Sequence, residues 1–144
     1  MPTGIVMMKP DVEAINPNYC ILVIDDEKIV CDRLSNELER EGFEVEAYTE
    51  SEQALQRIAS KYFDLVITDI KMRGPKGIEV MNFVRENHPS SKVIVITGFA
   101  TVETAREVLK AGAVDFIPKP FKMSKLRELV LRLAAEKNQA RKPR

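Results

Sequence analysis

The sequence contains few of the residues from which many functional sites are built. Among 144 residues there are no tryptophans, one histidine and two cysteines, Cys20 and Cys31. Two cysteines cannot form a disulfide framework, so we interpret both as ordinary thiols of a reducing compartment. His88 precedes Pro89 at an expected helix end, and we interpret it as a surface residue with no metal-binding or phosphate-carrying role.

The charge balance and the short apolar runs argue against two further classes of function. Lys and Arg total 22, as do Asp and Glu, so the formal net charge is zero. A nucleic-acid binder usually carries a basic excess. The longest apolar runs, near residues 21–24 and 93–96, are far shorter than a membrane span. Residues 1–18 lack the pattern of a secretion signal. We therefore expect a soluble, cytoplasmic protein that binds neither nucleic acid nor membranes directly.

Apolar runs alternate with segments of helical period along the chain. The expected strands are residues 21–24, 43–48, 65–68, 93–97 and 114–117. Residues 43–48 alternate apolar and acidic side chains, which is typical of an edge strand. The other four ranges are rich in β-branched residues, as buried parallel strands are.

Helices are expected between and after these strands, because apolar residues recur there at helical spacing. Gly42 and Gly112 are expected to end the first and fourth helices. The fourth carries Val102, Ala105, Val108 and Leu109. Five strand–helix units predict an α/β fold, a doubly wound five-stranded parallel sheet with helices on both faces. We expect one domain over residues 19–137, an N-terminal extension at 1–18, and a basic tail or linker start at 138–144.

Polar residues suited to chemistry follow four of the expected strands. Asp25 and Asp26 follow the first, Asp69 the third, Thr97 the fourth and Lys119 the fifth. In an open α/β sheet, ligands bind outside the carboxyl ends of the strands. We therefore expect these five side chains to converge at that edge of the sheet.

This set of side chains favours a metal and phosphate site. Carboxylates ~5 Å apart at an effective dielectric of ~20 repel by about 3 kcal/mol per pair, which a divalent cation would relieve. Oxygen-only ligands suit Mg²⁺, and one carboxylate could then be a nucleophile that forms an aspartyl phosphate. Singly, Asp25, Asp26 or Thr97 could be a helix N-cap, Asp69 a turn residue and Lys119 a solvated lysine. Their joint occurrence favours a common site.

The motif spacing resembles that of the receiver domain of two-component response regulators over residues 19–137. The matching motifs are "DD" after the first strand, "DIKM" with Gly77 after the third, "TG" after the fourth and "KP" after the fifth. The stretches "TGFATVETA" and "GAVDFIPKPF" are most similar to receivers of sigma-54-dependent transcriptional activators. The resemblance implies the flavodoxin-like strand order 2-1-3-4-5.

The resemblance also implies a phosphoacceptor and a metal site. Asp69 would receive the phosphoryl group from a sensor histidine kinase or a phosphotransfer protein. Asp25, Asp26, Asp69 and the backbone carbonyl of Lys71 would bind Mg²⁺. Such a domain catalyses its own phosphorylation and dephosphorylation, but it is not an enzyme that turns over a separate substrate.

Further residues take part in binding the phosphoryl group and in the response to it. Thr97 and Lys119 would bind the phosphoryl oxygens, and the Lys119–Pro120 bond would be cis. Thr97 and Phe116 would form the switch, which lacks the tyrosine hydroxyl common at the second position. Phe116 could also be a simple core residue.

Two residues are implied to control how long the phosphate persists. Lys71 and Phe99 would flank the path of the attacking water, two residues after Asp69 and Thr97. Neither is a good general base at neutral pH, so we expect slow self-dephosphorylation. One departure lies nearby: Arg73 stands where the family often has proline, and we expect an altered loop there, not a lost site.

Two other functions account for part of the pattern. A small Mg²⁺-dependent aspartyl-phosphate phosphatase of the haloacid dehalogenase type needs an Asp-x-Asp pair, whereas Asp25 and Asp26 are adjacent. A degenerate receiver would act only as a binding module, against which the complete set of acidic residues, Thr97 and Lys119 argues.

The surface built from the fourth helix, fifth strand and fifth helix is a candidate for contact with a partner or with a second copy. Its charges are of both signs, which suits specific recognition, although a plain solvated surface is the alternative. These charged residues are Glu103, Glu107, Lys110, Asp115, Arg127 and Glu128.

Overall fold

The computed structural model describes residues 19–141 except 73 and 75. The expected extension at 1–18, the position of Arg73 and residues 142–144 of the expected tail lie outside the described residues.

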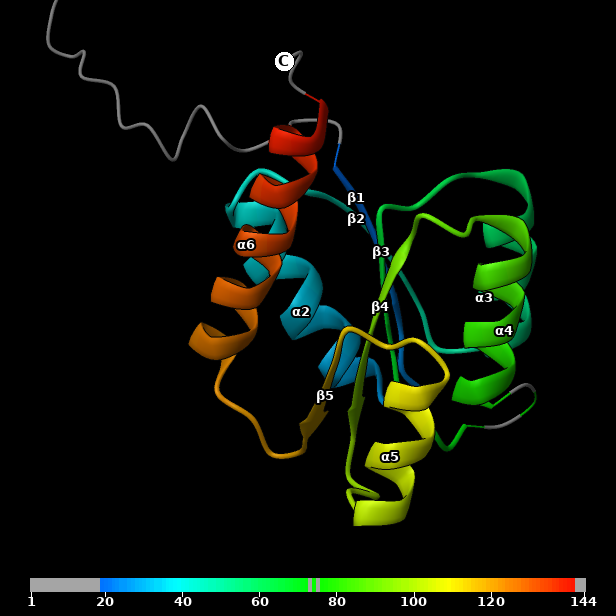
Figure 1. Cartoon of the computed structure of the whole chain (residues 1–144). Helices are drawn as coiled ribbons and strands as arrows, with labels where there is room; N and C mark the ends of the chain where they lie inside the picture. Colours follow the sequence, from blue (N-terminus) through cyan, green and yellow to red (C-terminus); the bar gives the residue numbers. More distant parts are fainter. Residues whose placement is uncertain (1–18, 73, 75, 142–144) are drawn as a thin grey trace, which may run out of the picture.

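Strands and helices alternate along the whole described chain. In order they are β1 (Cys20–Ile24), α2 (Lys28–Arg40), β2 (Glu44–Tyr48), α3 (Ser51–Ser60), β3 (Leu65–Thr68), α4 (Gly77–Asn87), β4 (Lys92–Thr97), α5 (Val102–Lys110), β5 (Asp115–Pro118) and α6 (Met123–Arg141). The five strands pair in parallel in the order β2-β1-β3-β4-β5. Helices α2 and α6 cover one face of the sheet, and α3, α4 and α5 cover the other (Figure 1). The predicted fold class and strand order are confirmed.

Strand β1 shows why the central strands are apolar throughout. Successive side chains of a strand point to opposite faces of the sheet. Ile21 and Val23 therefore pack in the layer of α2 and α6, while Leu22 and Ile24 pack in the layer of α3, α4 and α5. Since both faces are covered, a polar residue in this strand would be buried, and the first carboxylates come only where β1 ends.

The two edge strands differ from the three central ones. Strand β2 lies at one edge, as the alternating pattern of residues 43–48 predicts. Strand β5 lies at the other edge, and its residues 115–117 are only half-buried. The expectation that residues 114–117 form a buried strand was therefore wrong. Pro118 fits this position, because a proline is tolerated where a strand lacks a neighbour on one side.

Helix α5 buries less of its apolar stripe than the sequence predicts. Of its side chains only Val108 is buried, whereas Val102 is 69% and Leu109 is 47% exposed. Gly112, with φ +111, follows this helix, and Gly42, with φ +97, follows α2, so both glycines end their helices as expected. The result is that apolar side chains at both ends of α5 are exposed to solvent.

Candidate functional site

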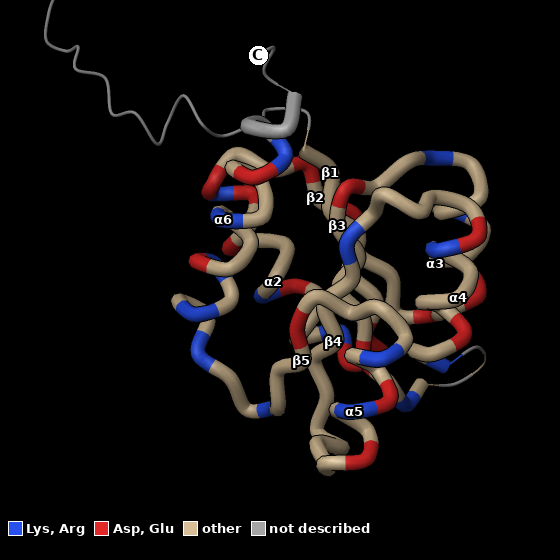
Figure 2. The backbone as a smooth tube through the Cα atoms, in the orientation of Figure 1, with Lys and Arg blue, Asp and Glu red and all other residues tan. Residues whose placement is uncertain are grey.

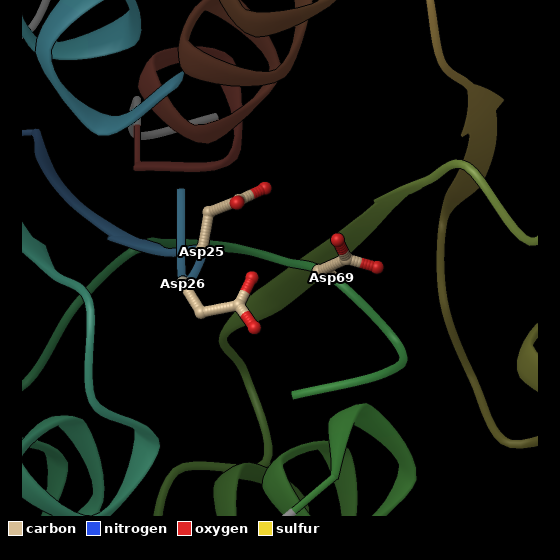
Figure 3. Close-up of side chains that lie close together, drawn as sticks. All are labelled: Asp25, Asp26 and Asp69. Carbon is tan, nitrogen blue, oxygen red and sulfur yellow. The ribbon is translucent and has the colours of Figure 1, made fainter. Parts of the chain in front are cut away.

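Three carboxylates meet where β1 and β3 end. Asp25 and Asp26 directly follow β1, and Asp69 directly follows its neighbour β3, with Ile24 paired to Thr68 in the register just before them. One oxygen from each carboxylate lies within 4.8 Å of the others (Figure 3). The predicted convergence of the three aspartates is confirmed.

The three carboxylates differ in burial. Asp25 is 3% and Asp69 is 6% exposed, while Asp26 is exposed. Burial raises the pKa of Asp25, even though hydrogen bonds from Lys119 and the Glu27 backbone act in the opposite direction. Asp25 Oδ1 accepts from the Glu27 N–H at 2.9 Å. The N-cap of α2 is Glu27, so neither Asp25 nor Asp26 is the N-cap residue.

Lys119 connects the end of β5 to this acidic cluster. Its Nζ donates to Asp25 Oδ2 at 2.7 Å, to Asp69 Oδ2 at 3.1 Å and to Glu27 Oε1 at 3.1 Å. Burial alone would lower the pKa of Lys119. The hydrogen bonds to Asp25 and Asp69 act in the opposite direction and outweigh burial, so the pKa is raised overall and the ammonium stays charged. Lys119 is thus not a solvated lysine, and it already offsets part of the repulsion between the carboxylates.

Thr97 ends β4 beside Lys119. It is fully buried, and its carbonyl oxygen accepts from the Lys119 N–H at 2.8 Å. Its Oγ1 accepts from the Phe99 N–H at 3.1 Å. The N-cap of α5 is Thr101, whose hydroxyl accepts from the Thr104 N–H, so the alternative that Thr97 is the N-cap of this helix is excluded. The Lys119–Pro120 bond is cis, as expected.

Lys71 and Phe99 lie at the opening of the site. The Lys71 Nζ is 4.5 Å from the centroid of the Phe99 ring, a distance at which an ammonium is attracted to the ring face. Phe99 is 51% exposed. Both residues line the same cavity as Asp69 and Lys119. The predicted neighbours of the phosphoacceptor therefore contact each other across the opening.

Gly77 holds the start of α4 close to the end of β3. A Cβ atom at this position would lie 2.4 Å from the Asp69 carbonyl oxygen and 2.8 Å from the Ile70 Cα. Both neighbours are backbone atoms, so a side chain would push the strand end and helix apart. The glycine in the "DIKM" motif region thus fixes the position of Asp69.

Three predicted residues have surroundings that differ from or extend the expectation. His88 is half-buried, its Nε2 lies 2.9 Å from the Ile58 carbonyl oxygen, and its ring meets Tyr62 edge-on at 5.3 Å. The surface interpretation was therefore wrong for His88. Phe116 is half-buried and packs against the core layer of α3, α4 and α5. Arg127 pairs with Glu37 of α2 at 2.6 Å, so it belongs to the α2–α6 surface.

Glu27 was not among the residues predicted for the site. Its carboxylate is the third one that Lys119 contacts, although it lies 92 residues away in the sequence. A signal was present, because Glu27 continues the acidic run that begins with Asp25.

The donor set fits a hard divalent cation. Asp25, Asp26 and Asp69 offer only oxygen atoms, and they are the group of described residues whose ligand atoms lie close enough together to hold a metal ion. Mg²⁺ favours carboxylate oxygens and retains several waters, which an opening to solvent on one side permits.

Comparisons with known proteins agree with this geometry. Residues 21–131 match the family described as response regulator receiver domain. The chain is 39% identical over 106 residues to the transcriptional regulatory protein ZraR of Klebsiella oxytoca, covering 74% of this chain and 24% of that protein. The chain thus spans about a quarter of the length of this relative.

Two solved structures show the same fold. The solution structure of the beryllofluoride-activated NtrC4 receiver domain dimer superposes with a TM-score of 0.76 at 34% identity, covering 83% of this chain and 98% of that one. A CheY-like response regulator receiver domain protein from Methanospirillum hungatei JF-1 superposes with a TM-score of 0.79 at 30% identity, covering 87% of this chain and 99% of that one.

Proposed function

The chain belongs to the receiver domain family of two-component response regulators, and on that premise we propose that Asp69 is its phosphoacceptor and that residues 19–137 form the receiver. The observation that carries the proposal is the contact of Lys119 with both Asp69 and Asp25 across the ends of β5, β3 and β1. A nearly buried carboxylate held beside a charged lysine and a second acidic group is the arrangement that phosphoryl transfer to an aspartate needs.

The transfer is a displacement at phosphorus. An Asp69 carboxylate oxygen attacks the phosphorus of a phosphohistidine on a sensor kinase or phosphotransfer protein. The P–O bond forms as the P–N bond breaks, and the bonding electron pair leaves on the imidazole nitrogen. Lys119 and the Thr97 hydroxyl donate hydrogen bonds to the phosphoryl oxygens, whose charge they stabilise.

The acidic cluster would hold Mg²⁺ through Asp25, Asp26, Asp69 and the backbone carbonyl of Lys71. A bound divalent cation supplies charge stabilisation to the phosphoryl oxygens in such a site. Asp25 and Asp26 would fix the cation beside Asp69, whose carboxylate would be the one that reacts with the phosphoryl group. The phosphatase and the degenerate receiver are not favoured by the family match, and the domain performs self-phosphorylation and not turnover of a separate substrate.

Phosphorylation of Asp69 can be tested on the protein directly. Incubated with a small phosphodonor and Mg²⁺, the protein is expected to gain one phosphoryl group by intact-mass spectrometry. Borohydride reduction of the phosphorylated protein is expected to convert Asp69, and no other aspartate, into homoserine. Peptide mapping then locates the homoserine. Homoserine at Asp25 or Asp26, or no phosphate uptake with Mg²⁺ present, would refute the assignment.

The relatives and the surface suggest a role in regulating transcription through partner proteins. The relative ZraR is named as a transcriptional regulatory protein. Figure 2 shows acidic and basic residues interspersed along the backbone, which supports contact with proteins more than with nucleic acid by this chain. Within the described residues, no helix combines the length and apolar character needed to cross a membrane.

The surface of α5, β5 and α6 is our candidate for a phosphorylation-dependent homodimer. Val102 and Leu109 on α5 and Val114 before β5 are exposed apolar residues on this side, and the NtrC4 receiver neighbour is described as a dimer. The mixed charges of Glu103, Asp115 and other residues would give the contact specificity.

Sedimentation decides whether this surface self-associates. Beryllofluoride with Mg²⁺ is expected to raise the mass toward that of a dimer, and Leu109→Glu is expected to keep it monomeric. Ile29→Glu is a matched control, because Ile29 is 69% exposed on α2, on the other side of the sheet. If the mass of the wild type did not change with beryllofluoride, or if both variants lost the dimer equally, the surface of α5, β5 and α6 would be a plain solvated surface and not a dimer contact.

A further inference from the structure

Glu27 uses its side chain in an unusual way for its position. It stands at the N-cap of α2, where a side chain commonly accepts from the first turn of the helix. Within the described residues it makes no such capping bond, and its carboxylate instead accepts from Lys119 Nζ at 3.1 Å. Its side chain is 61% exposed, whereas those of Asp25 and Asp69 are 4% and 8% exposed. Glu27 is therefore the contact of Lys119 that faces water.

The contacts of Lys119 use its full donor capacity. A lysine ammonium has three N–H donors and no acceptor. Its Nζ contacts three carboxylates, those of Asp25, Glu27 and Asp69. The N–H group that contacts Asp69 can turn to a phosphoryl group formed there, and a second N–H group becomes available to the phosphoryl oxygens only if the contact with Asp25 or with Glu27 is given up.

The burial of the three carboxylates indicates which contact is released. A buried carboxylate that loses its cation is left unpaired in a poorly solvated place, which is costly. Asp25 is in that position, and Asp69 is the residue that carries the phosphoryl group. Glu27 is exposed, so water can replace the lysine at its carboxylate, and exposed ion pairs contribute little.

We propose that Glu27 is a positioning residue, which holds the Lys119 ammonium at the opening of the unphosphorylated site and yields it to the phosphoryl group. This inference rests on the proposed phosphorylation of Asp69. Glu27 competes with the incoming phosphoryl oxygens for the same N–H group, so it sets how readily Lys119 changes partners. Glu27→Gln weakens that competition and removes a negative charge from the opening, and both changes favour binding of an anion beside Asp69.

Beryllofluoride binding at saturating Mg²⁺ measures this competition. Glu27→Gln is expected to bind beryllofluoride about two- to fivefold more tightly than the wild type, the range that an exposed ion pair allows. Glu27→Asp keeps the charge but is one methylene shorter, which weakens its contact with Lys119, so it is expected to bind beryllofluoride more tightly than the wild type but less tightly than Glu27→Gln. Glu39→Gln removes the same charge from the exposed side of α2 and is expected to bind as the wild type does.

A spectroscopic signal separates positioning from a merely structural role. The ε-methylene NMR signal of Lys119 is expected to differ between the wild type and Glu27→Gln without beryllofluoride, and to coincide in the two complexes. Equal affinities, or a Glu27→Asp variant that behaves as the wild type does, would overturn the inference while leaving phosphorylation intact. Failure of the wild type to bind beryllofluoride at all would instead refute the proposed function, and this inference with it.

Discussion

Replacing Lys119 by methionine is expected to slow phosphorylation of Asp69 by a small phosphodonor about 100-fold, at saturating Mg²⁺. The methionine has a similar length but no charge and no N–H donors. Removing one such donor from a preorganised site costs a factor of about 100 or more in rate, which corresponds to about 2.7 kcal/mol of barrier. The initial rate of phosphate uptake, followed by intact-mass spectrometry, measures the effect.

The same substitution is expected to destabilise the protein without divalent cations. Lys119 is the cation that contacts Asp25 and Asp69, and removing one partner of a largely buried ion pair costs about 3 kcal/mol. Urea unfolding at neutral pH, with and without Mg²⁺, measures the loss. Mg²⁺ is expected to restore most of the stability, because it supplies positive charge to the same carboxylates.

The destabilisation has a definite dependence on pH. The pKa of Asp25 is already raised by burial, and losing Lys119 would raise it further. When a carboxyl group has a higher pKa in the folded than in the unfolded protein, the folded protein binds more protons, so stability falls as the pH rises. The defect of Lys119→Met is therefore expected to shrink as the pH is lowered from neutral toward mildly acidic values.

A matched control distinguishes this site from a general loss of charge. Lys122→Met removes an exposed lysine three residues further along the chain, and it is expected to change neither the rate nor the stability. If Lys119→Met took up phosphate as fast as Lys122→Met, the assignment of Lys119 to the phosphoryl group would be wrong. If Lys119→Met and Lys122→Met had the same free energy of unfolding in urea, the ion pairs of Lys119 would have no net role in stability.

The sequence predicted the parts of the fold that depend on local pattern. The range 65–68 was predicted without error, and the ranges 21–24 and 93–97 each begin one residue earlier in the structure, because a β-branched run buried on both faces marks a central strand. The partial burial of β5 was missed, although the implied strand order placed it at an edge, since burial of a strand depends on its neighbours in the sheet and not on its own composition. The exposure of Val102 and Leu109 was missed for a related reason. Apolar residues at helical spacing show which side of a helix is apolar, but not whether another element of the fold covers that side.

The candidate site was predictable to the extent that it follows from topology. Asp25, Asp26 and Asp69 had to meet, because parallel strands bring their carboxyl ends to one edge. The same topology places Lys119 beside them, but its contact with Glu27 was not predictable, since a flexible side chain can reach any carboxylate near the strand ends. Glu27 and the contact of Lys71 with Phe99 depend on such side-chain reach, and they became visible only in three dimensions.

The contact of Lys71 with Phe99 leads to a prediction about the lifetime of the phosphate. Hydrolysis requires water to approach the phosphorus in line, opposite the Asp69 oxygen. The Lys71 ammonium lies 4.5 Å from the centroid of the Phe99 ring, and both residues line the same cavity as Asp69, so we expect them to cover this approach. Neither side chain is a good general base at neutral pH. We therefore expect slow self-dephosphorylation, with a lifetime of minutes or longer.

The double variant Lys71→Asn with Phe99→Glu is expected to lose phosphate about 10-fold faster, which is about 1.4 kcal/mol of barrier. Asparagine and glutamate leave the opening uncovered and offer oxygen atoms that orient a water by hydrogen bonding. Because the two residues contact each other, the effects of the two single substitutions on the rate of phosphate loss are expected to be non-additive. Either substitution alone breaks the contact and is expected to give part of the acceleration. Decay of the phosphorylated mass after removal of the phosphodonor gives all the rates.

A lysine at the same opening that is not part of the pair provides the control. Lys76 lines the same cavity, but its Nζ donates to the Met72 carbonyl oxygen at 2.9 Å. Lys76→Asn is expected to leave the decay rate unchanged, so faster decay in this variant would indicate a general effect of charge. An unchanged rate in the double variant, with the fold intact by circular dichroism, would mean that Phe99 only covers the start of α5. Faster loss confined to variants of the pair would show that the covering contact, and not the charge of the opening, sets how long Asp69 stays phosphorylated.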